Sequence, residues 1–309
     1  MKKHDTVYDA YVQILQEELV PAMGCTEPIA VAYCAAKAKE VLGVLPDKVD
    51  IRVSGNIIKN VKSVVVPNTG GLVGMEAAAA AGIIGGKPEK ELEVIAEVTP
   101  AQKEEIKVFL ETAQFTVAPT YGTEVLDIII TLEKDGHTAK ARIIRGHANI
   151  VLIEKDGKVL FQAKEGEEAH HGADRGLLNI KDIIEFANIV DIQDVQSALQ
   201  KQIDCNSAIS QAGLQEDWGA AVGKLLTRTQ GQDIRVKAKA AAAAGADARM
   251  GGCELPVIIV SGSGNQGITA SMPVITYARE LGKSQEELYR ALCVSDLVAI
   301  HEKTGIGKM

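Results

Sequence analysis

The chain has 309 residues and a formal net charge of -8; 46% of its residues are hydrophobic and 24% are charged. This length exceeds the usual size of one domain, so two domains, or one domain with a large insertion, are expected. The acidic balance argues against a partner that is nucleic acid or an anionic membrane surface, and no cluster of lysine and arginine overrides it.

A cysteine stands just ahead of a predicted helix over residues 29–42. Thr26 is a good N-cap, Glu27 suits the positive end of the helix dipole, and Pro28 is tolerated in a first turn. Backbone N–H groups and the dipole would then face the sulfur of Cys25 and favour its thiolate, the form that binds metals and attacks electrophiles. The alternative is a small buried residue at a tight turn into the helix.

Hydrophobic periodicity along the chain predicts an α+β fold. A helical catalytic unit is expected from residues 1–45 and 180–309, and an inserted domain with its connector from residues 46–179, with a boundary near Pro46. The strands between residues 114 and 163 are expected to form an antiparallel meander. The predicted helices cover 7–19, 29–42, 72–84, 89–96, 100–112 and most of the chain from 180 onward; the predicted strands cover 49–53, 61–66, 125–133, 138–144, 150–153, 159–162 and 257–260.

No secretory signal is evident in the first residues, which favours a cytoplasmic protein. Residues 255–278 carry no charge, but a polar, glycine-rich loop in their middle predicts strand, loop and helix in place of a membrane span. Five irregularly spaced cysteines without a CxxC motif favour reduced thiols over disulfides or a zinc site. His170 and His171 are interpreted as part of a polar connector and not as metal ligands.

Four loops combine glycine with short amide, hydroxyl or imidazole side chains at the end of an apolar element. Such loops let backbone N–H groups approach a carboxylate or phosphate, although each alone is more often an ordinary turn. The glycine motifs of dinucleotide-binding and P-loop proteins are absent from the sequence, so we expect a small anionic ligand. The loops are Ser54-Gly55-Asn56 with Lys59-Asn60, Asn68-Thr69-Gly70-Gly71, Gly146-His147-Ala148-Asn149 and Gly262-Ser263-Gly264-Asn265-Gln266-Gly267.

Together with Met23-Gly24-Cys25-Thr26-Glu27-Pro28 and Ala246-Asp247-Ala248-Arg249-Met250-Gly251-Gly252, these loops resemble the L-cysteine desulfidase family, which is related to the alpha chain of iron–sulfur L-serine dehydratases. The resemblance covers the whole sequence. It implies β-elimination from a small L-amino acid, either L-cysteine, giving pyruvate, ammonia and sulfide, or L-serine. It also implies an oxygen-labile 4Fe–4S cluster held by three cysteines, the first corresponding to Cys25, and no pyridoxal phosphate.

In this family the other two cluster ligands follow a segment that resembles residues 295–300. The sequence is therefore expected to be truncated at its C-terminus, and the 309-residue chain to be inactive and without an intact cluster. An alternative site would join Cys253 or Cys293 to Cys25. An alternative function is a catalytically silent fold that binds a small carboxylate or a partner, and a homo-oligomer is one expected assembly.

Lys59 and His147 are the candidates for the general base of the elimination. Lysine would need a pKa lowered by burial, whereas histidine ordinarily titrates near neutral pH. We expect the substrate-binding residues and Cys25 to line one cleft between the helical unit and the inserted domain, with the helix after Gly267 pointing its N-terminus into the cleft. The expected substrate-binding residues are Asn56, Asn60, Thr69, Gly70, Asn149, Arg249, Ser263, Gly264, Asn265 and Gln266.

Overall fold

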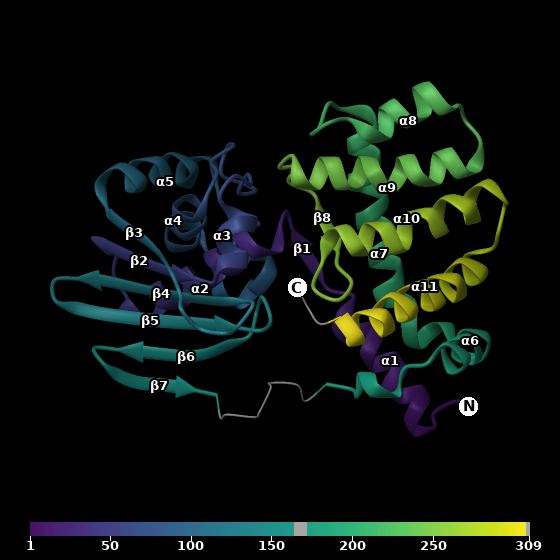
Figure 1. Ribbon diagram of the computed structural model, residues 1–309, viewed down its shortest axis with the longest axis horizontal. Helices are drawn as coiled ribbons and strands as arrows, with labels where there is room; N and C mark the ends of the chain where they lie inside the picture. The colour runs from purple at the N-terminus through teal and green to yellow at the C-terminus, as the bar shows by residue number, and fades with distance from the viewer. Residues whose placement is uncertain (164–171, 307–309) are drawn as a thin grey trace. The chain divides into compact units, whose positions relative to one another are not determined.

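The computed structural model describes residues 1–163 and 172–306, and the chain divides into two compact units (Figure 1). The helical unit contains residues 1–22 and the described residues from 172 onward, and the sheet unit contains residues 23–163. Among the described residues 57% are helical and 16% are in strands, so the chain has the predicted α+β class. The pair His170 and His171 lies outside the described residues.

The sheet unit is built on a six-stranded sheet with the order β3-β2-β4-β5-β6-β7. The predicted meander is confirmed for β4 to β7, which pair antiparallel in sequence order. It is wrong for β3, which pairs parallel with β2 at the opposite edge, because the intervening helices provide the crossover that a parallel pair requires. The strands are β2 (Lys48–Val53), β3 (Gln114–Pro119), β4 (Asp127–Lys134), β5 (His137–Ile144), β6 (Ile150–Lys155) and β7 (Lys158–Gln162).

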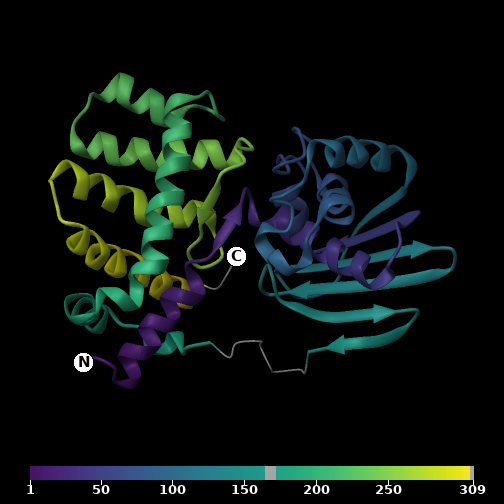
Figure 2. The ribbon, with the colours of Figure 1, turned by 180° about the vertical axis from the view of Figure 1, so that it is seen from behind.

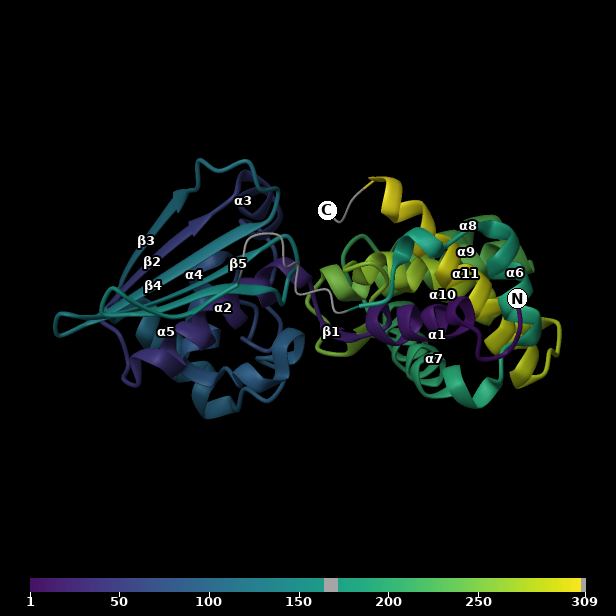
Figure 3. The ribbon, with the colours of Figure 1, turned by 90° about the horizontal axis from the view of Figure 1, so that it is seen from below.

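Helices α2 (Thr26–Leu42), α4 (Met75–Gly85) and α5 (Pro100–Thr112) lie on one side of this sheet (Figure 3). Alternate side chains of β2, β4 and β5 are buried, as expected for strands with one covered face. Helix α2 contacts both β4 and β5 and packs against α4. The chain therefore passes between the units after Ala22 and not near Pro46, because the alanine-rich α2 is buried between the sheet and α4.

Two further local predictions differ from the structure. Residues 61–66 are not a strand: helix α3 (Gly55–Val61) occupies the first of them, and the rest form a turn in which Val66 N donates to Leu72 O at 2.8 Å. Residues 89–96 contain only the 3₁₀ helix η1 (Pro88–Glu93), in which Glu91 has a φ of 46°. In residues 61–66 a turn replaces most of the predicted strand, and in residues 89–96 a short 3₁₀ helix replaces the predicted α-helix.

Gly82 sets the close approach of α4 to α2, since a Cβ at this position would lie 2.0 Å from the carbonyl oxygen of Ala32. We expect Gly82→Ala to lower the free energy of unfolding by about 1–3 kcal/mol through overpacking, measured as a fall in the urea midpoint. The matched control is Gly55→Ala on α3, where a Cβ meets nothing within 4 Å. Equal midpoints for the two variants would contradict this role of Gly82.

In the helical unit, the long helix α7 crosses α9, α10 and α11 and contacts each of them (Figure 2). The predicted arrangement of strand, loop and helix over residues 255–278 is confirmed by β8 and α10. Within the described part of the chain, none of the helices combines the length and the apolar character that spanning a membrane requires. The elements are α1 (Thr6–Glu18), β1 (Pro21–Met23), η2 (Arg175–Leu177), α6 (Ile180–Ile189), α7 (Ile192–Gln215), α8 (Val222–Gln230), α9 (Ile234–Met250), β8 (Pro256–Ile258), α10 (Gly264–Glu280) and α11 (Gln285–Ile306).

Candidate functional site

The sulfur of Cys25 lies beside a carboxylate. Cys25, and not Thr26 as predicted, is the N-cap of α2, and its Sγ donates a hydrogen bond to Glu27 Oε2 at 2.9 Å. Thr26 Oγ1 donates to the same oxygen at 3.2 Å. The sulfur therefore has a carboxylate as its neighbour as well as the helix dipole on which the sequence argument relied.

Glu27 joins three parts of the sheet unit into one polar cluster. Its Oε1 accepts a hydrogen bond from Asn60 Nδ2 of α3 at 3.1 Å. Burial alone would raise the pKa of Glu27, but the hydrogen bond from Cys25, the charge of His147 and the bonds from its own amide and Asn60 bring this pKa below its usual value. We call these four residues, Cys25, Glu27, Asn60 and His147, the Glu27 cluster.

Glu27 is the functional candidate that the sequence did not reveal, because it was assigned only to the helix dipole. His147 is 8% exposed, so the imidazole is held inside the unit, whereas Lys59 on α3 is exposed. The burial that a catalytic lysine would need is therefore not present within the sheet unit, and the geometry favours His147 as the base.

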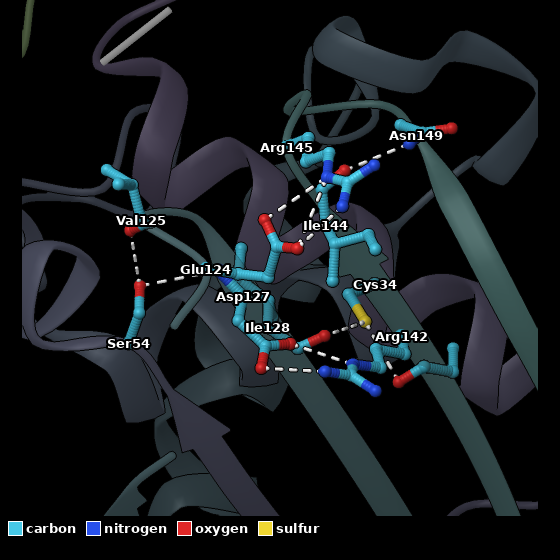
Figure 4. A network of polar contacts seen from close by, with 11 residues as sticks. Cys34, Ser54, Glu124, Val125, Asp127, Ile128, Arg142, Ile144, Arg145 and Asn149 are labelled. Carbon is cyan, nitrogen blue, oxygen red and sulfur yellow. Dashed lines mark hydrogen bonds and ion pairs between the residues drawn. The ribbon is translucent and has the colours of Figure 1, made fainter. Parts of the chain in front are cut away.

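The segments that carry Asn60 and His147 are anchored by the network in Figure 4. Ser54, the N-cap of α3, donates from its Oγ to the carbonyl oxygen of Val125 at 2.7 Å and accepts from Asp127 N at 3.3 Å. Arg142 Nε and Nη2 bind the buried Asp127 carboxylate at 2.9 and 3.0 Å. Asn149 Nδ2 donates to the carbonyl oxygen of Ile144 at 2.9 Å, so the predicted ligand residue Asn149 holds its own loop.

Thr69 and Gly70 also serve a turn in the structure. Thr69 Oγ1 donates to Val66 O at 2.7 Å and accepts from Leu72 N at 3.2 Å, and the side chain is fully buried. This turn nevertheless lies close to the Cys25 turn, since a Cβ on Gly24 would be 2.6 Å from Pro67 Cγ. Asn56, in contrast, is exposed on α3.

In the helical unit the structure brings Arg249 and the loop before α10 together. Ser263 is the N-cap of α10 and accepts from Gln266 N at 3.3 Å. Arg249 is 4% exposed and its Nη1 donates to Asn265 Oδ1 at 3.0 Å. A Cβ on Gly264 would lie 2.2 Å from Arg249 Nε, so glycine is required where the guanidinium crosses the loop. A helix N-terminus with a nearby guanidinium is suited to a carboxylate.

The predicted site residues thus form two groups, one in each unit. Cys25, Asn60 and His147 belong to the sheet unit, and Arg249 belongs to the helical unit together with residues 263–266. The convergence of both groups on a single cleft stays a prediction.

A groove of about 430 Å³ lies between α10 and α11 in the helical unit. The predicted ligand residue Gln266 is at its edge and donates from Nε2 to the carbonyl oxygen of Ala299 at 3.4 Å. Small residues form much of the surface, and one acidic and one basic side chain lie at the end of α11. The lining residues are Gln266, Thr269, Ala270, Ser295, Val298, Ala299, Glu302, Lys303 and Ile306.

The described residues do not provide a complete metal centre. Among them there is no group of three or more His, Cys, Asp or Glu side chains that could hold a metal ion. Cys34 is fully buried, its Sγ lies 3.3 Å from Ala141 O, and burial raises its pKa. Burial likewise raises the pKa of Cys293, which lies inside α11. Of these three thiols Cys25 is the one placed in a polar cluster, so the donor set shown by the described residues does not fit a cluster held by three cysteines.

A family model described as the serine dehydratase alpha chain matches residues 89–309, a range that includes His147 and Arg249 but not Cys25. A UPF0597 protein of Desulfitobacterium hafniense is 55% identical to the chain. The alignment includes 100% of this chain and 72% of that relative. Those of Lachnoclostridium phytofermentans and Treponema denticola are each 46% identical over 98% of this chain, which covers 73% and 72% of their lengths. No solved structure matches the chain. The chain belongs to the serine dehydratase alpha-chain family.

Proposed function

We propose that the chain is the catalytic part of an iron–sulfur-dependent lyase that carries out β-elimination on a small L-amino acid, with L-cysteine as the preferred substrate and L-serine as the alternative. The observation that carries this proposal is the Glu27 cluster, in which a buried imidazole, a carboxylate and a thiol come together. The family membership supports the same class of reaction.

In this reaction His147 takes the proton from Cα, and its bonding electrons form the Cα–Cβ double bond as the Cβ–S or Cβ–O bond breaks. Cysteine loses hydrosulfide, and serine loses hydroxide, which takes up a proton to give water. The resulting aminoacrylate tautomerises to an imine, which water hydrolyses to pyruvate and ammonia. Glu27, whose pKa is held low, remains a carboxylate and stabilises the imidazolium that forms on His147. This pairing of a base with a charged partner is a common arrangement for proton abstraction.

The substrate carboxylate is proposed to bind at the start of α10. Free backbone N–H groups of the first turn, the helix dipole and the Arg249 guanidinium all favour an anion there. Asn265 orients Arg249 through the hydrogen bond between its Oδ1 and Nη1, at 3.0 Å.

Cys25 is proposed as one ligand of a 4Fe–4S cluster, and no role is proposed for pyridoxal phosphate. Beside Cys25, the described residues show no group of His, Cys, Asp or Glu side chains that could complete such a site. For this reason the chain alone is expected to be silent in catalysis.

The test compares three proteins after anaerobic reconstitution with iron and sulfide: this chain, the longer Desulfitobacterium hafniense relative, and a chimera in which residues 1–309 replace the matched part of that relative. We expect the relative and the chimera to hold close to four irons and to release pyruvate from L-cysteine or L-serine. The chain alone is expected to do neither. A chimera with an intact cluster that releases no pyruvate from either amino acid would refute the lyase proposal.

A further inference from the structure

A buried carboxyl in the helical unit has no charged partner among the described residues that would explain its burial. Asp296 of α11 is 0% exposed, and its Oδ1 accepts a hydrogen bond from Gln202 Nε2 of α7 at 3.0 Å. Its second oxygen, Oδ2, and the amide oxygen of Gln202, Oε1, are both buried, and neither has a hydrogen-bond partner among the described residues. Two buried acceptors without donors are costly, and an ionised carboxylate in this position would cost more.

One proton satisfies both acceptors. A proton on Asp296 Oδ2 can be donated to Gln202 Oε1, while Gln202 Nε2 continues to donate to Asp296 Oδ1. The acid and the amide then form a two-way pair in which every polar atom has a partner, and no charge is buried.

The helices packed on α11 leave the carboxyl in an apolar environment. On the same helix, burial and then the charge of Asp296 raise the pKa of Cys293. The other side chains that α6 and α10 bury are apolar or hydroxyl groups, and Gln202 and Asn206 on α7 are neutral. The buried titratable groups of α1 make hydrogen bonds to other partners than Asp296. Tyr8 donates to Asp194, and Tyr11 donates to the carbonyl oxygen of Leu177. Glu18 accepts from Arg175, the cation of η2.

We propose that Asp296 carries a proton in the folded chain and, paired in both directions with Gln202, fastens α11 to α7 as a lock that weakens when the pH rises. The same helix α11 accepts the hydrogen bond from Gln266 at Ala299 and donates from Ser295 Oγ to Ala270 O at 2.8 Å. The lock therefore holds the helix that supports the first turns of α10, a role that does not depend on the proposed lyase activity.

The direction of the pH effect follows from the acid's two states. Burial raises the pKa of Asp296 from 3.8 to about 7, with the hydrogen bond from Gln202 acting in the opposite sense. At a pH between these two pKa values, the folded chain keeps a proton that the unfolded chain releases. The stability that the lock supplies is therefore complete at low pH, falls as the pH rises through this range, and is lost above it.

The experiment uses the whole chain and two readouts. With aspartate labelled with ¹³C at the side-chain carboxyl, NMR should show one carboxyl in the wild type that stays protonated at pH 5 and titrates near neutrality, and Asp296→Asn should lack it. In urea denaturation, the unfolding equilibrium constant of the wild type should rise relative to that of Asp296→Asn by on the order of 10²-fold between pH 5 and pH 8. The variant is not affected because asparagine can make the same two-way pair without a proton.

The matched control is Asp204→Asn, an exposed aspartate on α7, for which no such gain is expected. Ionisation of every aspartate by pH 5 in the wild type would overturn the proposal even if Asp296→Asn failed to fold. So would stabilisation of the wild type, but not of Asp296→Asn, by added sodium or potassium, since the two acceptors would then hold a cation in place of a proton.

Discussion

Cys25→Ser in the chimera is expected to abolish iron binding and pyruvate release together. Serine has nearly the same size as cysteine, and its hydroxyl can still donate to Glu27 Oε2, the oxygen that Cys25 Sγ contacts at 2.9 Å. The fold of the Glu27 cluster should therefore survive, while the thiolate that an iron–sulfur cluster requires is lost. The loss in activity should exceed the roughly 10–100-fold that removal of a supporting residue around a metal typically costs.

The matched control is Cys34→Ala, on the same helix. Cys34 is fully buried against β4 and β5, so its truncation should lower stability by a small amount through lost packing and leave the iron content unchanged. Iron would be measured per chain after anaerobic reconstitution, with circular dichroism to compare folding. Retention of iron by Cys25→Ser, or its loss in Cys34→Ala, would remove Cys25 from the ligand set.

Much of the fold could be predicted from the sequence wherever one element carries its own periodicity. The β-rich runs that form β2 and β4 to β7 and the helical pattern over residues 100–112 are local signals, and the structure has those elements. The parallel pairing of β3 with β2 and the burial of α2 in the sheet unit are not local. They depend on which surfaces meet across long stretches of chain, and residue spacing carries no information about that.

The same distinction applies to the candidate site. The glycine-rich loop could be singled out because small residues next to a helix start have a recognisable composition. Arg249 could be singled out through the segment that carries the family resemblance, and the structure brings the two together. Glu27 could not, because an exposed glutamate in a first turn and a half-buried one have the same sequence signature. Its role became visible only through Asn60 and His147, which reach it from other elements.

His147→Gln in the chimera is expected to lower kcat for pyruvate release by about 10²–10⁴-fold, the usual range for loss of a general base. Glutamine keeps hydrogen-bonding capacity but cannot accept the Cα proton, so KM should change little. The matched variant Lys59→Gln, at an exposed position of α3, should stay within a few-fold of the parent. Steady-state rates from pH 6 to pH 9 would test both, since the low-pH limb of the wild-type profile should disappear with the imidazole.

Proton exchange distinguishes a base from a residue that merely supports the fold. In D₂O the parent should exchange the Cα proton of an unreactive substrate analogue such as L-alanine, and His147→Gln should not, while iron content and circular dichroism stay unchanged. Glu27→Gln should fall between the two, because it removes the carboxylate that stabilises the imidazolium but leaves the imidazole in place. If Lys59→Gln lost exchange and His147→Gln kept it, the base would be the lysine, which would require Lys59 to be buried when substrate is bound.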